Sequence, residues 1–354
     1  MDRVLKFCLL GCGRIAKRHS ELLGNRLIKN AQLCGVCDLD VAKAKAIANN
    51  FEVPFFKDMH VMMQEIKPDV VVILTESGNH AKITIELAIY KAHIIVEKPI
   101  ALTLRDADNM IKVCEKNNIN LYVIKQNRFN TPIIKLKEAL DNGRFGKLVL
   151  GTVRVRWCRD QSYYDQASWR GSWSQDGGVL TNQAIHHIDM LLWMMGDVEL
   201  VFGLGATQLV NIEAEDTGIV NLRFRNGALG IIEATTAARP KDIEGSISIM
   251  GEKGFVEVGG FAMNEIKHWE FEQPNKQDQD VLDKYSVNPP NVYGFGHQEY
   301  YISVVDSILN NRKYSIDGIS GRKSLELVTA IYESIESGKP VYMNNLKGKI
   351  RLGN

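Results

Sequence analysis

The chain has 354 residues, a length that suits two domains of ~100–200 residues each. Hydrophobic residues make up 45% and charged residues 24%, which excludes a disordered chain and a small disulfide scaffold. The 43 Lys and Arg residues balance the 42 Asp and Glu residues, so the net charge of +1 predicts no nucleic-acid partner.

Targeting signals and metal motifs are not evident. The N-terminal apolar run Val4–Leu10 falls far short of the ~20 residues that span a bilayer, and it lacks the features of a signal peptide. Cys34 and Cys37 form a CxxC motif without a second pair at zinc-finger spacing, so we interpret them as buried thiols. We therefore expect a cytoplasmic protein with no membrane partner and no metal ion.

The first third of the chain alternates short apolar runs with amphipathic stretches. Runs of nearly unbroken Val, Ile and Leu are typical of strands buried on both faces of a parallel sheet. The predicted strands are Val4–Leu10, Gln32–Cys37, Val70–Thr75, His93–Val96 and Leu121–Ile124. Strand and helix in alternation predict an α/β fold, with a doubly wound parallel Rossmann sheet over residues 1–125.

The remaining residues, 126–354, are predicted to form an α+β domain with a mostly antiparallel sheet. Apolar and polar residues alternate from Lys147 onward, and Asn226–Gly227 is a strong hairpin signal. The other expected features are a second hairpin around Glu252–Gly254, a helix Leu180–Met195 ended by Gly196, a surface loop Pro274–Asn291, and helices Tyr300–Leu309 and Gly321–Glu336.

A dinucleotide-binding signal follows the first predicted strand. Residues 11–16 read Gly-Cys-Gly-Arg-Ile-Ala, in which the first glycine makes a tight turn and the second lets the backbone approach a pyrophosphate. Asp38 ends the second predicted strand, 22 residues after Ala16. An acid at this spacing is expected to hold the ribose hydroxyls and to repel a 2′-phosphate, which favours NAD over NADP.

Two positions carry a catalytic signal. Lys98 follows the predicted strand His93–Val96 directly before Pro99, where ligands bind at the carboxyl ends of parallel strands. Asn182 and His186 are four residues apart and are therefore expected on one helical face, with Asp189 one turn further. The alternatives are a surface lysine, a hydrogen-bonded core histidine, and an Asn–His metal pair that lacks a third ligand.

Taken together, these motifs resemble the Gfo/Idh/MocA oxidoreductases over nearly the whole chain. That family joins a Rossmann domain to a C-terminal α/β domain and oxidises or reduces sugar and cyclitol hydroxyls. A finer resemblance is to the WlbA/WbpB subgroup of UDP-N-acetyl-2-amino-2-deoxyglucuronate 3-dehydrogenases, which act in bacterial surface-polysaccharide pathways. It rests on VIKQNRFN, on the segment RDQSYYDQASWRGSWSQDGGVLTNQAIHHIDMLLWMMG, and on NIEAEDTG, EGSISIMGEKGFVEVGG and NEIKHWEF.

The resemblance implies a set of site residues. For the cofactor these are Gly11, Gly13, Arg14, Ile15, Asp38, Thr75, Glu76, Asn79, His80, Glu97, Lys98, Gln126, Trp169 and Arg170. For the sugar they are Lys98, Arg159, Tyr163, Asn182, Gln183 and His186, of which Lys98, Asn182 and His186 are the candidate catalytic residues. Many family members have Asp where this chain has Asn182, so proton transfer is expected of His186 and Lys98. Without the resemblance, the loop that holds Arg159, Tyr163, Trp169 and Arg170 would be interpreted as structural.

The leading hypothesis is NAD-dependent oxidation of the C3 hydroxyl of a UDP-N-acetylglucosaminuronate-type nucleotide sugar, in O-antigen (lipopolysaccharide) sugar biosynthesis. The alternatives are a dehydrogenase of the same family for a free sugar or inositol, and a non-catalytic NAD-binding sensor. The resemblance also implies a homotetramer. It leaves open whether NADH is released or reoxidised in place by 2-oxoglutarate.

Overall fold

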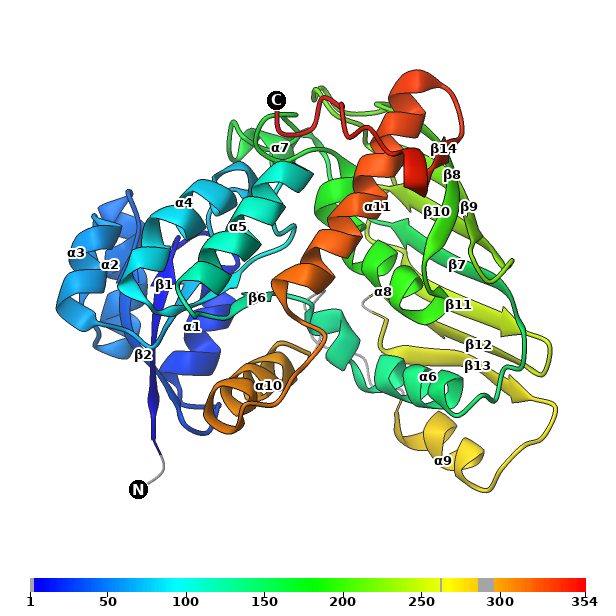
Figure 1. The fold of residues 1–354 in the computed structure, drawn as a ribbon, viewed down its shortest axis with the longest axis horizontal. Coiled ribbons are helices and arrows are strands. Elements are labelled where there is room, and N and C mark those ends of the chain that lie inside the picture. The colour runs from blue at the N-terminus through cyan, green and yellow to red at the C-terminus, as the bar shows by residue number, and fades with distance from the viewer. Residues whose placement is uncertain (1–2, 262, 286–295) are drawn as a thin grey trace. The chain divides into compact units, whose positions relative to one another are not determined.

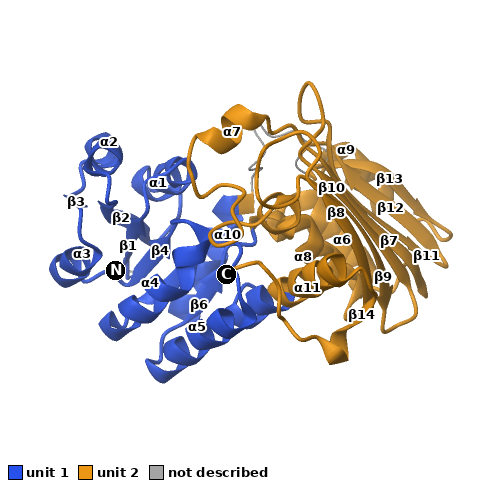
Figure 2. Cartoon of the chain, turned by 90° about the horizontal axis from the view of Figure 1, so that it is seen from above, with its two compact units in different colours: residues 1–125, 297–323 blue, residues 126–296, 324–354 orange. Residues whose placement is uncertain are grey.

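The computed structural model describes residues 3–261, 263–285 and 296–354. The chain divides into two compact units, coloured separately in Figure 2. Unit 1 holds the residues up to Lys125 together with His297–Lys323, and unit 2 holds Gln126–Gly296 and Ser324–Asn354. The sequence-based division also places a boundary after residue 125, but it assigns 297–323 to the second domain, whereas the structure groups them with unit 1.

Unit 1 is built around a six-stranded parallel sheet in the order β3-β2-β1-β4-β5-β6, which is the doubly wound Rossmann order. Figure 1 labels β1, β2 and β6 of this sheet. Its strands are β1 (Leu5–Leu10), β2 (Ala31–Cys37), β3 (Phe55–Phe56), β4 (Val70–Ile73), β5 (His93–Val96) and β6 (Leu121–Val123). All four residues of β4 are buried, as the unbroken apolar run predicts. The helices are α1 (Ala16–Gly24), α2 (Val41–Phe51), α3 (Met59–Ile66), α4 (His80–Leu87) and α5 (Leu104–Lys116).

The segment 297–323 is part of unit 1 because its side chains and backbone complete the core next to β6. Tyr301, in α10 (Gly296–Asn310), is fully buried. The Ile316 carbonyl accepts a hydrogen bond of 2.7 Å from the Val123 N–H in β6. The Tyr122 hydroxyl donates to Oγ of Ser307 over 2.9 Å. These contacts join residues nearly 200 positions apart, which explains why local sequence patterns do not indicate them.

Unit 2 contains an eight-stranded sheet in the order β13-β12-β11-β7-β10-β9-β8-β14 (Figure 1). β7 and β10 pair in parallel and the other neighbours are antiparallel. The strands are β7 (Leu148–Arg156), β8 (Val198–Ala206), β9 (Thr217–Phe224), β10 (Leu229–Thr235), β11 (Glu244–Gly251), β12 (Gly254–Gly259), β13 (Glu265–Phe271) and β14 (Val341–Tyr342). The helices are α6 (Thr131–Asp141), α7 (Gln161–Asp165), α8 (Ile185–Met195), α9 (Gln277–Lys284) and α11 (Gly318–Ser337), which begins in unit 1.

Helix α8 lies against β7 and β11 of this sheet. At Gly151 in β7 the approach is so close that a Cβ atom would lie 2.7 Å from Cγ of Met195. The predicted hairpin at Asn226–Gly227 is present, with Gly227 at φ +88° in the turn between β9 and β10. The fold class predicted from the sequence is therefore confirmed for both units.

Two predicted elements differ from the structure. The expected surface loop Pro274–Asn291 contains helix α9, and its residues 286–291 lie outside the described part of the chain. The expected helix Leu180–Met195 is divided into a π-helical turn, Val179–Gln183, and helix α8. Across the described residues, none of the helices combines the length and apolar character that crossing a membrane requires.

Candidate active site

The glycine-rich loop between β1 and α1 has the shape that a bound dinucleotide needs. Gly11 adopts φ +96°, and a Cβ atom there would lie 2.8 Å from the carbonyl carbon of Leu74. At Gly13, in contrast, a Cβ atom would meet nothing within 4 Å, so this side of the loop is open. No side chain caps the N-terminus of α1 next to Ile15. The loop thus leaves backbone N–H groups and open space where a pyrophosphate would sit, and it fits the cofactor.

Asp38 lies at the carboxyl end of β2, beside this loop. One carboxylate oxygen accepts a hydrogen bond of 2.6 Å from the Cys12 backbone N–H, and the other accepts one of 2.7 Å from Asp40 N–H. A carboxylate has about four acceptor positions, so two bonds hold its orientation and leave capacity for hydroxyl donors. Arg14 is exposed and Ile15 is half-buried on the same loop.

The segment after β4 contains four of the predicted cofactor residues. Asn79 donates through Nδ2 to Oε2 of Glu76 over 3.1 Å. His80 is fully buried, and its two ring nitrogens lie 3.2 Å from the Thr75 carbonyl and 2.8 Å from the Pro99 carbonyl. Burial lowers the pKa of His80, although both carbonyl contacts oppose this effect. His80 therefore connects the chain after β4 with the chain after β5.

The predicted residues Glu97 and Lys98 follow β5. Oε2 of Glu97 accepts a hydrogen bond of 3.0 Å from the Lys98 backbone N–H, and Oε1 lies 3.2 Å from Nε2 of His19. Burial alone would raise the pKa of Glu97, but the hydrogen bond from His19 and the charges of His19, Lys98 and His297 lower it to about 2. Glu97 is thus an ionised, buried group that holds the backbone of Lys98.

His19, Glu97 and His297 form a buried cluster whose potential ligand atoms lie within 4.8 Å of one another. The Tyr301 hydroxyl lies 2.7 Å from Nδ1 of His19, and the rings of His19 and His297 meet edge to face at 5.4 Å. Hydrogen bonds on both ring nitrogens account for the orientation of His19. We therefore assign the cluster a structural role beside Lys98.

In unit 2, the π-helical turn Val179–Gln183 is held by Glu215. The Val179 N–H donates to the Glu215 carbonyl and the Leu180 N–H to its Oε1, both over 2.9 Å. A Cβ atom on Gly178 would lie 2.3 Å from Oε2 of Glu215, so only glycine fits at that position. The carbonyl and carboxylate of Glu215 thus take the place of a helix cap. The residues they hold form a π-helical turn instead of the predicted α-helix.

Burial raises the pKa of Glu215 to about 7, although hydrogen bonds from the Leu180 backbone and the Tyr332 hydroxyl act in the opposite direction. The carboxyl group beneath the turn therefore titrates near neutral pH.

His186, at the start of α8, is half-buried. Its Nε2 lies 3.1 Å from the side-chain amide Nε2 of Gln126. The same two segments are joined by a bidentate ion pair, in which Nε and Nη2 of Arg128 donate to Asp189 over 2.7 and 2.8 Å. Asp189, expected on the catalytic face, is instead buried in this pair and accepts a further bond from Oγ of Ser324.

His187 is a core residue, as its position next to His186 on the helix predicts. It is fully buried, and its ring meets that of Trp157 edge to face at 5.6 Å. Within the described ranges, neither ring nitrogen has a hydrogen-bond partner. Burial accordingly lowers the pKa of His187 to about 3.

Asn182 and Gln183 belong to a chain of polar side chains that continues to Tyr163. Nδ2 of Asn182 donates to Oδ1 of Asp176, and Nε2 of Gln183 lies 3.2 Å from Oδ1 of Asn182. The same Nε2 donates to the Tyr163 hydroxyl over 3.1 Å. The second Asp176 oxygen accepts a hydrogen bond of 2.8 Å from the Gly171 backbone N–H.

Three more predicted residues surround the Tyr163 ring or lie close to it. The guanidinium carbon of Arg170 lies 4.3 Å from the centre of the Tyr163 ring and 4.9 Å from that of Trp169. Arg159 approaches the Tyr163 ring to 5.4 Å, and its Nη1 donates to Asp242 over 2.8 Å. Two guanidinium groups therefore lie close to the phenol, and Arg170 favours an anionic ligand beside it.

Sequence reasoning did not single out Asp176 or Glu215. Asp176 directly precedes Gly177-Gly178, and Glu215 lies in the NIEAEDTG segment, so both occur in segments that carried the family resemblance. An acid next to a glycine pair is a weak signal by itself. Their contacts with Asn182 and Leu180 depend on the tertiary fold.

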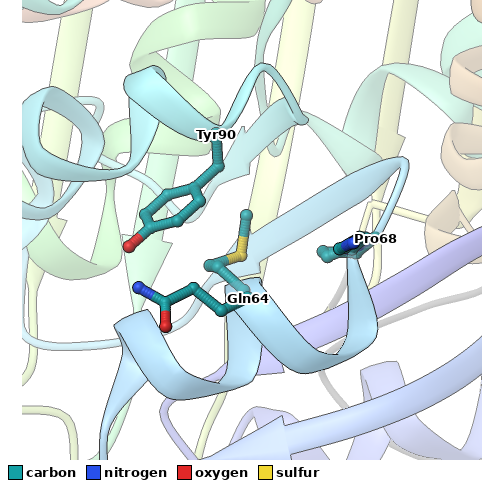
Figure 3. A pocket seen from close by; sticks show the side chains of 5 residues that line it. Gln64, Pro68 and Tyr90 are labelled. Carbon is teal, nitrogen blue, oxygen red and sulfur yellow. The ribbon is translucent and has the colours of Figure 1, made fainter.

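A shallow pocket elsewhere in unit 1 contains none of the predicted site residues. It is lined by Met63, Gln64, Lys67, Pro68 and Tyr90. Figure 3 shows the Gln64 and Tyr90 side chains on one side of it. We assign it no role.

Comparisons with known proteins match the chain to two family models, one for each end of the chain. Residues 5–125 match the model of a family described as "Oxidoreductase family, NAD-binding Rossmann fold", and residues 137–343 match "Oxidoreductase family, C-terminal alpha/beta domain". A curated relative, myo-inositol 2-dehydrogenase of Thermotoga maritima, is 28% identical over 97% of this chain and 100% of its own length.

Two solved structures are more similar in sequence. The WlbA dehydrogenase from Chromobacterium violaceum, in complex with NADH and UDP-GlcNAcA, is 41% identical, with a TM-score of 0.90 over 97% of this chain and 96% of that chain. The WlbA dehydrogenase from Bordetella pertussis, in complex with the same two ligands, is 38% identical, with a TM-score of 0.89 over 97% of this chain and 98% of that chain.

Proposed function

Since the chain belongs to the Gfo/Idh/MocA oxidoreductase family and has an NAD-binding Rossmann domain, we propose that it oxidises the C3 hydroxyl of a UDP-N-acetylglucosaminuronate-type nucleotide sugar. The observation that carries this proposal is the 41% and 38% identity, over 97% of the chain, to two dehydrogenases that bind NADH and UDP-GlcNAcA. We further propose that the 3-keto product serves bacterial surface-polysaccharide (O-antigen) biosynthesis.

The cofactor is NAD. We assign its adenosine and pyrophosphate to the loop 11–15 and Asp38, and its nicotinamide half to Thr75, Glu76, Asn79, His80, Glu97 and Lys98. Gln126, Trp169 and Arg170 are proposed as further cofactor contacts. When bound, NAD supplies a hydride acceptor at the nicotinamide ring. Asp38 would accept hydrogen bonds from the ribose hydroxyls, and its charge would exclude a 2′-phosphate.

We assign the proton chemistry to two side chains. His186 is half-buried at the start of α8, and a neutral imidazole is suited to accept the hydroxyl proton near neutral pH. Lys98, whose backbone is held by Glu97, would donate a hydrogen bond to the same oxygen as it gains negative charge. Asn182, Gln183 and Tyr163 would bind the sugar, and Arg159 would pair with the uronate carboxylate.

The second candidate is oxidation of a free cyclitol or sugar. It is favoured by the 28% identity to a myo-inositol dehydrogenase over the full length of that protein. NADH formation separates the two candidates when UDP-N-acetylglucosaminuronate and myo-inositol are compared at equal concentrations. Turnover of the nucleotide sugar alone supports the proposal, whereas turnover of inositol alone contradicts it. Binding of NAD without turnover of any sugar would favour the sensor hypothesis.

Adding 2-oxoglutarate to the same assay tests how NADH is reoxidised. Turnover that requires 2-oxoglutarate and yields no free NADH would show that bound NADH is recycled in place. Accumulation of free NADH that 2-oxoglutarate does not reduce would show release instead. The six cysteines are free thiols, as expected in a reducing compartment, and the proposal places the reaction in the cytoplasm.

We also propose that the chain forms a homotetramer through the open face of its large sheet. Leu204, Ile219, Leu229 and Ile231 are exposed, and the strand register places them on one face of β8, β9 and β10. Contiguous exposed apolar side chains are typical of an association surface. Light scattering on the wild type and on Ile219→Asp tests this, because a charge at this face should reduce the assembly size.

A further inference from the structure

We propose that Asp176 is a positioning residue that fixes the direction of every hydrogen bond from Asn182 to Tyr163, so that the Tyr163 hydroxyl acts as a donor to the substrate. The proposal deepens the proposed function and rests on it for the identity of the sugar. An ionised carboxylate such as that of Asp176 accepts hydrogen bonds and donates none.

Asp176 is well placed to set this direction. Its side chain is buried, with 3% exposed, and Gly171 N–H donates to Oδ2 over 2.8 Å. Its Oδ1 contacts the side chain of Asn182, which must present its Nδ2 donor to a carboxylate. The carbonyl end of the Asn182 amide is therefore directed away from Asp176.

The donor and acceptor roles at Gln183 follow from those at Asn182. Because Oδ1 of Asn182 is an acceptor, the Gln183 amide presents Nε2 to it over 3.2 Å. The same Nε2 donates to the Tyr163 hydroxyl oxygen over 3.1 Å. A phenol that accepts this bond retains its own proton for another acceptor. Arg170, whose guanidinium carbon lies 4.3 Å from the centre of the Tyr163 ring, favours a negatively charged or carbonyl oxygen as that acceptor.

This arrangement also explains the amide at position 182. An aspartate there would bring two carboxylates into hydrogen-bond contact, and two such groups cannot both remain ionised without a large cost. A paired exchange, Asp176→Asn with Asn182→Asp, avoids this conflict. The amide introduced at position 176 would accept from Gly171 N–H and donate to the carboxylate introduced at position 182, which would still accept from Gln183.

The experiment is a double-mutant cycle on the Michaelis constant for the sugar. Asp176→Asn lets the amides reverse, and Tyr163→Phe removes the hydroxyl; we expect each to raise KM ~10-fold. If Asp176 acts through Tyr163, the double variant should resemble either single variant, with KM again raised ~10-fold. Independent, multiplicative effects of ~100-fold would overturn the proposal, as would a normal KM in Asp176→Asn.

A second readout does not depend on the substrate. We expect Asp176→Asn and Asn182→Asp each to lower the melting temperature of the free protein, and the paired exchange to restore it. Failure of the pair to recover would overturn the Asp176–Asn182 contact even if the single variants do not fold. Asp216→Asn is the matched control, because Asp216 is also buried but accepts from Gln208 and Leu209 N–H.

Asp216→Asn should lower the melting temperature, and its effect on KM should be independent of Tyr163→Phe.

The proposed substrate and the proposed role of Asp176 can be refuted separately. A wild type that oxidises myo-inositol but not the nucleotide sugar refutes the proposed substrate, and the cycle is then measured with inositol. Loss of coupling with a working substrate refutes only the role of Asp176.

Discussion

The side-chain amide of Gln126 lies 3.1 Å from Nε2 of His186, and this contact determines which imidazole nitrogen can accept a proton. If the amide oxygen faces the ring, Nε2 carries the proton and Nδ1 is the unprotonated nitrogen. If the amide nitrogen faces the ring, the proton is held on Nδ1 instead. The Arg128–Asp189 ion pair, which joins the same two segments, keeps this contact in place.

Gln126→Glu should therefore shift the acid limb of the pH profile of kcat/KM to higher pH. A carboxylate beside Nε2 stabilises the imidazolium, so the pKa of His186 should rise and kcat/KM should begin to fall at a higher pH than in the wild type. The pH dependence of kcat/KM measures this. His186→Asn is the control: it should remove the limb and most of the rate, with NAD affinity roughly unchanged. An acid limb that survives in His186→Asn would assign the base to another group, with Lys98 as the first candidate.

Lys98→Met should leave NAD bound and lower turnover severely. The loss of one preorganised donor to developing charge costs ~10²–10³ in rate. Stopped-flow or steady-state turnover, combined with calorimetric titration of NAD, measures both effects. Lys91→Met serves as a matched control because Lys91 is exposed in the turn before β5. Near-normal turnover of Lys98→Met would place Lys98 outside the reaction.

Asp38→Ala should weaken NAD binding and narrow the preference for NAD over NADP. The substitution removes the ribose acceptor and the charge that repels a 2′-phosphate. It also removes the hydrogen bonds to Cys12 and Asp40 N–H, so a melting curve should accompany the binding titrations. A variant that discriminates against NADP as strongly as the wild type does would show that Asp38 is not the ribose ligand.

His187 should make the protein lose stability in mild acid. Its pKa is about 3 in the folded state, below the ordinary histidine value of 6.5, so protonation favours the unfolded state. The stabilisation that comes from a neutral His187 is fully present well above pH 6.5 and decreases as the pH falls toward 3. Between pH 6.5 and pH 5 the free energy of unfolding falls by about 2 kcal/mol, because each pH unit in this range is worth up to ~1.4 kcal/mol.

Denaturant unfolding of wild type and His187→Leu at pH 7 and pH 5 measures this contribution. The variant should show a smaller loss of unfolding free energy between the two pH values. Equal losses would mean that His187 binds a proton as readily in the folded protein as in the unfolded chain, and would contradict its lowered pKa. The burial of His187 also means that His187→Asn would report on the core, so it is unsuitable as a control for His186.

Much of the fold could be predicted because it depends on local periodicity. The unbroken run Val70–Ile73, the alternation in Leu148–Arg156 and the Asn226–Gly227 turn each specify their own element. The membership of 297–323 in unit 1 could not be predicted, because it depends on contacts such as that of Val123 with Ile316.

For the site, the glycine loop and Asp38 have a fixed spacing and could be identified from the sequence. The π-helical turn could not, because it results from hydrogen bonds that Glu215 makes across the fold. Similarly, the role proposed for Asp176 depends on its contact with Asn182, six residues away along an irregular turn. Local sequence patterns do not predict the role of a residue when that role depends on contacts made in the folded protein.

The proposed function depends on which sugar carbon is oxidised, and isotope transfer identifies that carbon. UDP-N-acetylglucosaminuronate with deuterium at C3 is incubated with the enzyme and NAD, and the nicotinamide ring and the sugar are analysed by mass spectrometry. If C3 is oxidised, the deuterium moves from the sugar to the reduced cofactor and the sugar becomes a 3-keto derivative. Reduced cofactor without deuterium, formed while the label stays at C3, would contradict it.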